Sequence, residues 1–429
     1  MKCVLHAGQL VTLRGPNRPR VGNELSELEI IHDGGMLIRD GKIDVVGPSE
    51  EIERNLTALS RQVSEGQRDA DILDVEGRVV LPGFVDAHTH LVFAGDRLDD
   101  FERRARGETY EQIAKTGGGI WSTVEKTRAA SESELFAVAR KRADAFLRHG
   151  STTIEAKSGY DLTFEGELKI LRVISRLNEE TSLEIVPTFL GAHAVPRDTS
   201  SDQYVDVLIN EMLPKVASQK LAEFCDVFCE PGYFSIEQSR AILTVAKKLG
   251  LKLRGHVDQL TNSGGAKLMA ELGAVTADHL EKTDEQGIAA LKSTNVQPVL
   301  LPGSVYTLGS TSYPAARKMI EAGLAIVLAT DFNPGSSPTL SMPMILSLAC
   351  TQMKMSPAET ITASTINAAY SLGRGDKIGS LEPGKLANFS VFDCADYREL
   401  AYWFGVSQTH SVYIRGKRVE VWGAQAAGL

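Results

Sequence analysis

The stretch Pro82-Gly83-Phe84-Val85-Asp86-Ala87-His88-Thr89-His90 decides the fold of this 429-residue chain. It predicts a short strand that ends in two histidines. His88 and His90 are two positions apart, so on a strand both imidazoles point to one face and can share a metal ion. Short motifs of this kind also match by accident, as pairs of surface or core histidines. The rest of the chain has to show whether this pair stands at an active site.

Further strand-like runs follow this first one, and helix-like stretches separate most of them. Ser131 to His149 is such a helix, since Ser131 and Glu134 form a capping box and Gly150 stops it. About eight such βα units over roughly 290 residues are typical of a (β/α)₈ barrel. A doubly wound open sheet has the same periodicity and stays an alternative. The eight runs are 84–90, 151–157, 183–190, 225–229, 252–256, 274–279, 296–301 and 325–331.

Both ends of the chain differ from this middle part and are rich in β-structure. Two-residue turn signals at Asp40-Gly41, Glu76-Gly77 and Arg415-Gly416 each lie between apolar runs, which predicts hairpins. The polar residues 49–70 predict a helix or a loop. We therefore expect a small composite β-sandwich domain built from both termini, with domain limits of 1–80, 81–384 and 385–429.

Composition and charge exclude several classes of protein. The chain has 55 acidic and 46 basic residues, a net charge of −9 and 43% hydrophobic residues. This acidic balance argues against nucleic acid or an anionic membrane as partner, and no run approaches the roughly 20 apolar residues of a membrane helix. Five cysteines and the lack of a secretory pattern at the start favour a reducing compartment, so we expect a cytoplasmic protein.

Polar residues gather at the ends of the predicted strands, and five of the nine histidines lie there. The carboxyl ends of barrel strands meet at one mouth, where barrel enzymes carry their sites. His256 and Asp331 end two later strands and can join His88 and His90 around one metal. Three imidazoles and a carboxylate suit zinc or iron better than magnesium or calcium. Such a metal lowers the pKa of a bound water toward neutrality. The histidines at strand ends are His88, His90, His193, His256 and His279.

These strand ends resemble those of the amidohydrolase superfamily, in which both termini flank a metal-dependent hydrolase barrel. The closer likeness is to the imidazolonepropionase family, ring-opening hydrolases of histidine degradation, and it covers nearly the whole chain. The segments that carry it are Pro82–His90, His90-Leu91-Val92-Phe93-Ala94-Gly95-Asp96-Arg97, Lys157-Ser158-Gly159-Tyr160, Gly191-Ala192-His193-Ala194-Val195-Pro196, Asp226-Val227-Phe228-Cys229-Glu230, Gly255-His256-Val257-Asp258-Gln259, Ala277-Asp278-His279-Leu280-Glu281 and Thr330-Asp331-Phe332-Asn333-Pro334-Gly335.

The resemblance implies one zinc or iron ion per chain, held by His88, His90, His256 and Asp331. It implies the hydrolytic opening of 4-imidazolone-5-propanoate to N-formimino-L-glutamate by a metal-activated water. Asp331 would act as general base, and His279 would hydrogen-bond the oxyanion or orient the water. Arg97 would pair with the propionate tail. The remaining substrate contacts would come from Tyr160, His193, Gln259, Asn333, Gly335 and Ser336.

Two other functions stay open on the sequence. The same metal set would serve another mononuclear amidohydrolase, such as a nucleobase deaminase. Gln259 stands where related deaminases, and some imidazolonepropionases, have Glu. A barrel without its metal could be a non-enzymatic assembly protein. For partners, we expect a small anionic substrate and a homodimer, the commonest symmetric assembly. Lys157 is a possible carbamylated bridge between two metals but lies on the wrong strand for one, and Glu230 is the stronger candidate for a second-metal ligand.

Overall fold

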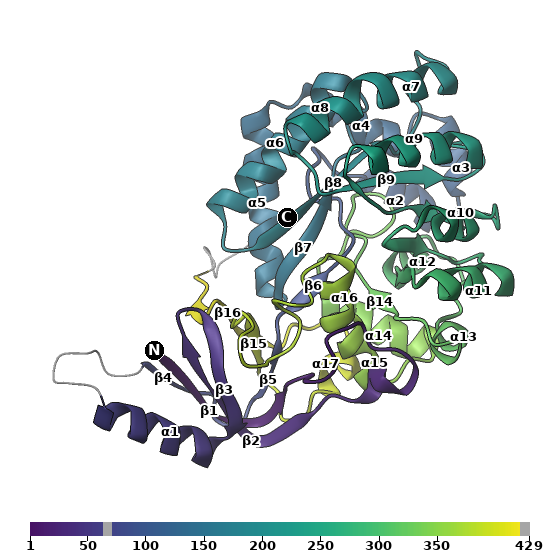
Figure 1. Cartoon of the computed structure of the whole chain (residues 1–429). Helices are drawn as coiled ribbons and strands as arrows, with labels where there is room; N and C mark the ends of the chain where they lie inside the picture. The colour runs from purple at the N-terminus through teal and green to yellow at the C-terminus, as the bar shows by residue number, and fades with distance from the viewer. Residues whose placement is uncertain (63–70, 421–429) are drawn as a thin grey trace. The chain divides into compact units, whose positions relative to one another are not determined.

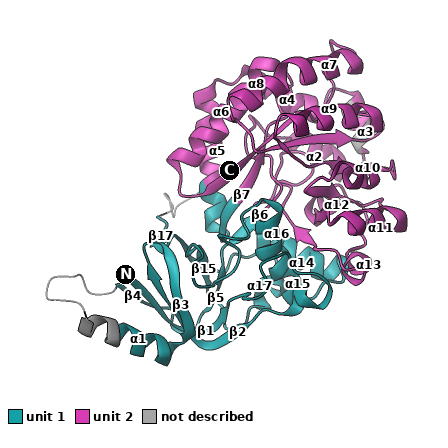
Figure 2. Ribbon diagram, viewed as in Figure 1, with its two compact units in different colours: residues 1–86, 144–153, 341–428 teal, residues 87–143, 154–340, 429 magenta. Residues whose placement is uncertain are grey.

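The chain folds into two compact units, which Figure 2 colours separately. The computed structural model describes residues 1–62 and 71–420. One unit comprises residues 1–86, 144–153 and the described residues from 341 onward; the other comprises 87–143 and 154–340. These units follow other limits than the predicted domains 1–80, 81–384 and 385–429, which remain a prediction.

Parallel strands form one sheet, in the order β14-β13-β12-β11-β9-β8-β7-β6 with β10 beside β9. Strands β7, β8 and β9 of this sheet can be followed in Figure 1. Beyond the ends of this order, Thr89 forms a parallel bridge with Phe332. The His90 N–H donates to the Phe332 carbonyl at 2.8 Å, and the Asp331 N–H donates to the His88 carbonyl at 3.0 Å. The predicted barrel is therefore confirmed over the open sheet. The strands are β6 Phe84–Asp86, β7 Ser151–Lys157, β8 Glu184–Ala192, β9 Phe224–Cys229, β10 Lys252–Leu253, β11 His256–Val257, β12 Thr276–His279, β13 Gln297–Leu300 and β14 Val327–Leu328.

Helices follow most of the barrel strands, and α5 begins at the capping residue that the sequence indicates. The Ser131 N–H donates to Glu134 Oε2 at 2.8 Å and the Glu134 N–H to Ser131 Oγ at 3.2 Å, which confirms the predicted capping box. The helices are α2 Leu98–Ala105, α3 Tyr110–Lys115, α4 Ile120–Ala129, α5 Glu132–Arg148, α6 Phe164–Glu180, α7 Ser201–Val207, α8 Leu213–Ser218, α9 Ile236–Lys248, α10 Gly265–Leu272, α11 Glu285–Thr294, α12 Pro302–Thr307 and α13 Ala316–Glu321, with a π-helical turn at Leu208–Met212.

The terminal strands form a second sheet, as expected from the β-rich ends of the sequence. Its order is β17-β16-β15-β5-β1-β2-β3, with β4 beside β1. Lys42 of β3 bridges to Leu386, and Ile43 and Tyr413 belong to one buried apolar cluster, so the sheet curls around its own apolar face. The strands are β1 Lys2–Val11, β2 Ile30–Arg39, β3 Lys42–Pro48, β4 Asp71–Asp74, β5 Val79–Pro82, β15 Phe389–Phe392, β16 Thr409–Ile414 and β17 Lys417–Arg418.

One of the three predicted hairpins is wrong. Asp40-Gly41 joins the antiparallel strands β2 and β3, and Arg415-Gly416 joins β16 and β17. Glu76-Gly77 makes a tight turn with φ of 53° and 79°, but β4 and β5 do not pair with each other. Both run parallel to β1, because that ten-residue strand supplies hydrogen-bond partners for each of them in succession.

The remaining helices belong to the same compact unit as the terminal sheet. They are α1 Ser49–Gln62, α14 Met342–Met353, α15 Pro357–Ala363, α16 Ile366–Ser371 and α17 Glu399–Tyr402, with a 3₁₀ turn at Gly22–Ser26. The predicted helix or loop over 49–70 is thus a helix as far as residue 62, and 63–70 lie outside the described residues. Cys225 and Cys229 are buried on β9 as small apolar residues. None of the described helices has the length and apolar character needed to cross a membrane.

Candidate active site and metal centre

The four predicted metal ligands converge on one point although they come from distant parts of the chain. His88 and His90 follow β6, His256 begins β11, and Asp331 follows β14. The Nε2 atoms of His88 and His256 are 3.1 Å apart, and Asp331 Oδ1 is 3.5 Å from Nε2 of both His88 and His90. All four side chains are buried. The structure thus brings the predicted ligand set together.

The hydrogen bonds around the imidazoles indicate where their lone pairs point. His88 Nδ1 lies 2.7 Å from Asp278 Oδ2, and His256 Nδ1 lies 3.1 Å from Asp226 Oδ1. A carboxylate can only accept, so each Nδ1 carries the proton and each Nε2 carries a lone pair. Two lone pairs 3.1 Å apart repel each other unless a cation lies between them. These residues therefore fit a metal ion.

The electrostatics of the surroundings favour neutral imidazoles. Burial lowers the pKa of His88 well below its usual value, and Lys157 and His256 lower it further. Burial likewise lowers the pKa of His90, with His256 next in effect. A neutral imidazole is the form that binds a metal, so His88 and His90 are ready to act as ligands at neutral pH.

A network of buried charges lies behind these ligands. Lys157 Nζ is 2.7 Å from both Glu155 Oε1 and Asp226 Oδ2, and Arg254 Nε is 3.7 Å from Asp278 Oδ2. Burial alone would lower the pKa of Lys157, but Asp226 and Glu155 outweigh it and raise that pKa. With Asp331, the network holds four carboxylates against two cationic side chains. A divalent cation would balance these charges, and an uncompensated buried charge is costly.

Asp331 and His279 have backbone conformations that L-residues rarely adopt. Their φ angles are 53° and 82°, in the left-handed region. Such strain concentrates at functional sites, where the surrounding structure holds it in place. His279 Nδ1 is 3.3 Å from Glu281 Oε1, and its ring centroid is 5.2 Å from that of His256. Burial lowers the pKa of His279, but the charge of Glu281 and its hydrogen bond raise it overall. Glu281 therefore holds the Nδ1 side of the His279 ring in place.

The predicted tail anchor, Arg97, is buried and firmly held. Its Nε–H donates to Thr123 Oγ1 at 2.9 Å. A Cβ added at Gly335 would overlap Nη1 of Arg97, so the guanidinium lies directly against the glycine backbone. Arg104 Nη1 donates to the Gly335 carbonyl at 2.9 Å. Arg97 thus lies beside Gly335, four residues along the chain from Asp331.

Tyr160 and His193 lie beside the metal-binding cluster. The Tyr160 ring centroid is 5.6 Å from that of His90 and 5.2 Å from that of His193. The His193 ring stacks on His90 at 5.1 Å, and its Nδ1 is 2.9 Å from the Gly159 carbonyl. Because that carbonyl accepts the Nδ1 proton, the other ring nitrogen of His193 is left as an acceptor.

The loop after Asp331 forms a tight turn of its own. Asn333 Oδ1 accepts from the N–H groups of Gly335 and Ser336 at 2.8 and 2.7 Å, and Asn333 Nδ2 donates to the Asp331 carbonyl at 2.7 Å. Gln259 is held through its backbone, whose N–H donates to Glu230 Oε1 at 2.6 Å. The structure therefore places Asn333, Gly335 and Ser336 in one turn beside Arg97, and Tyr160 and His193 beside His90. Among the described residues, the Gln259 side chain forms no hydrogen bond with any of them.

Lys157 and Glu230, the two candidate ligands for a second metal, form other interactions in the structure. Lys157 is an ammonium between two carboxylates, so it is not a carbamylated bridge. Glu230 accepts from the backbone of Gln259 and Leu260 and from Thr261. Within the described part of the chain, the clusters able to hold a metal are His88–His90–His256 and His88–His279–Asp331, which share one centre.

Sequence reasoning missed the carboxylates that orient the imidazoles. Asp226 and Asp278 stand inside buried strands, β9 and β12, where a charged residue is rare unless it is paired. That placement was a usable signal. The sequence contains no comparable signal for Thr123, which lies in a helix without a recognisable motif.

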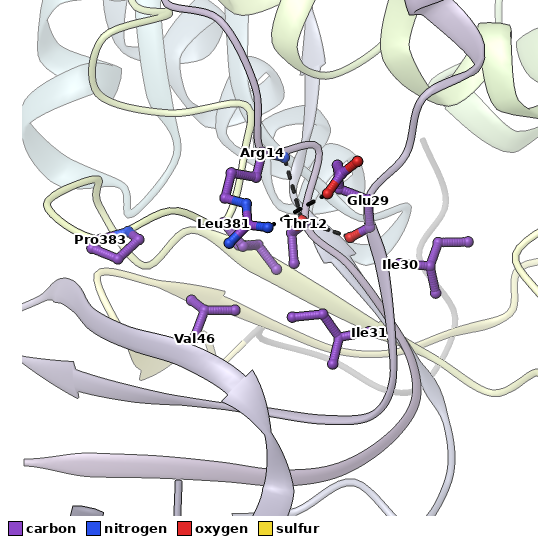
Figure 3. Close-up of a pocket in the computed structure, with 8 residues that line it drawn as sticks. All are labelled: Thr12, Arg14, Glu29, Ile30, Ile31, Val46, Leu381 and Pro383. Atoms are coloured by element: carbon purple, nitrogen blue, oxygen red, sulfur yellow. Dashed lines mark hydrogen bonds and ion pairs between the residues drawn. The ribbon is translucent and has the colours of Figure 1, made fainter. Parts of the chain in front are cut away.

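The other unit contains a pocket that is lined by none of these residues (Figure 3). Its volume is ≈ 260 Å³. Two of its lining residues, Arg14 and Glu29, form an ion pair with 3.5 Å between Nη2 and Oε2. Both side chains are at least half exposed, so this pair contributes little. The pocket offers no cluster of catalytic groups. Its lining consists of Thr12, Arg14, Glu29, Ile30, Ile31, Val46, Leu381 and Pro383.

Known proteins resemble this chain over nearly its whole length. The Amidohydrolase family matches residues 79–419. An imidazolonepropionase from Solibacter usitatus is 58% identical over 97% of this chain and 98% of its own length. One from Geobacillus thermodenitrificans is 45% identical over 97% of both. Among solved structures, an adenosine deaminase from Xanthomonas campestris with bound zinc has a TM-score of 0.69 at 19% identity, over 97% of this chain and 92% of that one.

The sequence identity of each match decides whether it shows only the fold of this chain or also its family. The deaminase, at 19% identity, supports the barrel fold alone. The matches at 45% and 58% identity extend over both terminal segments as well as the barrel. The chain therefore belongs to the amidohydrolase family and, within it, to the imidazolonepropionases.

Proposed function

We propose that this protein opens the ring of 4-imidazolone-5-propanoate by hydrolysis and releases N-formimino-L-glutamate, a step of histidine degradation. The observation that carries the proposal is the position of Arg97 against Gly335, in the loop that begins with Asp331. One short loop thus joins a carboxylate anchor to the metal-binding cluster. This arrangement suits a small substrate with a hydrolysable carbonyl and a carboxylate tail.

In this reaction, water adds across the ring amide bond. The water oxygen bonds to the carbonyl carbon and the C–N bond breaks. One proton of the water goes to the ring nitrogen, and the other is released to solvent as the new carboxylic acid ionises to a carboxylate. A metal ion bound in such a site activates water and polarises the carbonyl. Asp331 takes the proton from the attacking water and passes it to the leaving nitrogen. His279, oriented by Glu281, donates a hydrogen bond to the developing oxyanion or orients the water.

The other side chains hold the substrate. Arg97 pairs with the propionate tail. Tyr160 and His193 line the ring from the side of His90, and the Gln259 amide hydrogen-bonds a ring N–H or carbonyl. Gln259 has no carboxylate, so it cannot replace Asp331 as the base. Asn333, Gly335 and Ser336 contact the substrate or the carboxylates of the product.

We further propose one zinc or iron ion per chain, held by His88, His90, His256 and Asp331. The three imidazoles and one carboxylate support these metals, which favour nitrogen ligands more than magnesium or calcium do. The bound zinc of the structurally similar deaminase is consistent with this choice. We also propose that the protein acts as a cytoplasmic homodimer without nucleic-acid or membrane partners.

Removal of the anchor tests this proposal. We expect Arg97→Met to raise KM for imidazolonepropionate by a factor that corresponds to about 1.5–3 kcal/mol, the scale of a hydrogen bond to a charged group. The loss of ultraviolet absorbance of freshly made substrate measures it. The matched control is Arg106→Met. Arg97 and Arg106 flank helix α2 on opposite sides, and the exposed pair of Arg106 with Glu102 contributes little.

The same assay separates the alternative enzyme. A nucleobase deaminase would release ammonia from purines or pyrimidines, and these neutral rings carry no carboxylate for Arg97. Turnover of nucleobases with no opening of imidazolonepropionate by the metal-loaded wild type would contradict the proposed function.

A further inference from the structure

Helix α4 holds the segment that carries Arg97 at four points. Segment 94–100 runs along the helix in the opposite direction, so its successive residues meet successively earlier helix positions. The contacts join Ala94 N to Thr127 Oγ1 at 3.1 Å, the Asp96 carbonyl to Lys126 Nζ at 3.1 Å, Arg97 Nε to Thr123 Oγ1 at 2.9 Å, and Asp100 Oδ2 to Gly119 N at 2.8 Å.

Only one of these four contacts reaches the functional side chain itself. Thr123 is 1% exposed and Arg97 is 8% exposed, so their hydrogen bond is shielded from water. Because Nε–H is taken by Thr123, the guanidinium presents its terminal edge, Nη1 and Nη2, to a carboxylate. Gly335 closes off the space on the side of Nη1, which prevents the group from shifting in that direction.

The chemistry of threonine fits this task. A β-branched side chain has few χ1 rotamers in a helix, so its hydroxyl oxygen is an acceptor at a fixed place. Valine has the same shape without the acceptor and would leave a buried Nε–H unpaired. The guanidinium would then rotate toward another hydrogen-bond acceptor, and Nη1 and Nη2 would no longer have a fixed orientation.

We propose that Thr123 is a positioning residue that fixes the terminal edge of Arg97 at one depth and so determines the length of the carboxylate tail that the enzyme accepts. The inference rests on the proposed function, because it assumes that Arg97 binds the tail. It assigns to helix α4 a role in specificity that no motif in its sequence indicates.

The test compares imidazolones with acetate, propionate and butyrate tails. The wild type should prefer propionate. In Thr123→Val, we expect KM for the propionate substrate to rise about tenfold, with kcat changed less than about twofold, since loss of a contact made equally in the ground state and the transition state raises KM alone. The preference in kcat/KM for propionate over the other two tails should fall by a similar factor. Thr123→Ser, which keeps the acceptor, should restore most of both.

A double-mutant cycle distinguishes positioning from a structural role. In an Arg97→Met background, Thr123→Val should change KM and tail preference little, because the two residues act as one unit. The matched control is Thr276→Val, since this buried hydroxyl has no hydrogen-bond partner among the residues that the structure describes. If Thr123→Val does not fold, Gly335→Ala, which crowds the same guanidinium from its other side, should lower the tail preference instead.

The possible failures can be told apart. If the wild type does not open imidazolonepropionate, the proposed function itself is wrong. If the wild type does so and Arg97→Met raises KM, but Thr123→Val keeps the wild-type KM and tail preference, the role of Thr123 is overturned and the proposed function stands. A tenfold effect of Thr123→Val that persists in the Arg97→Met background would also overturn it.

Discussion

Replacement of Asp331 by Asn is expected to lower kcat for imidazolonepropionate by a factor of about 10²–10⁴, the usual contribution of a general base. Asn keeps the shape of the side chain and one oxygen that can face the metal, but it cannot take a proton. Asp331 Oδ1 also lies 3.5 Å from both His88 and His90, so some metal loss should accompany the loss of turnover.

Turnover should therefore be measured together with metal content. A variant that binds metal as well as the wild type but is inactive would assign Asp331 mainly to proton transfer, whereas loss of both would assign it to metal binding as well. The control is Asp284→Asn at the start of α11, where Asp and Asn cap a helix equally well. Wild-type turnover in Asp331→Asn would show that the assignment of the base is wrong.

The largest effect on stability is expected at Lys157. This ammonium is fully buried between Glu155 and Asp226, and Asp278 lies 3.9 Å away. Lys157→Met would leave these carboxylates buried without their cation, a change that typically costs about 3–5 kcal/mol. We expect a marked fall in melting temperature and weaker metal binding, because Asp226 and Asp278 orient two of the imidazoles.

The exposed pair Lys318–Glu285 provides the comparison for this substitution. Its two side chains are 64% and 84% exposed, and such pairs contribute about 0–1 kcal/mol. Lys318→Met should therefore leave the melting temperature nearly unchanged. Equal melting temperatures for the two variants would mean that the buried charge network is not what stabilises the base of the site.

The barrel could be predicted because its strands are continuous apolar runs between punctuating residues. The run Ser151–Lys157 follows Gly150 and matches β7 in full. The hairpin predicted at Glu76-Gly77 is wrong because these residues do form a turn, but the strands on either side of it do not pair with each other. The two strands that flank the turn, β4 and β5, both pair with β1, about 70 residues earlier in the chain. A two-residue turn motif does not show whether a distant strand will pair with its flanking strands in place of a hairpin.

The metal ligands of the candidate site could be predicted from the sequence, but the residues that orient the functional side chains could not. A His-x-His pair and an Asp at strand ends are recognisable by type and spacing. By contrast, Asp278 is 190 residues from the His88 that it orients, so only barrel closure brings the two together. Thr123 is an ordinary helix residue until Arg97 is placed beside it.

Metal analysis of the purified protein and its ligand variants tests the central claim most directly. We predict one equivalent of zinc or iron per chain in the wild type, and less than ~0.1 equivalent after His88→Ala or His256→Ala, with ring-opening activity lost in parallel. The exposed His32→Ala should behave as the wild type. If both ligand variants retain a full equivalent of metal and normal activity, these side chains do not hold the catalytic ion.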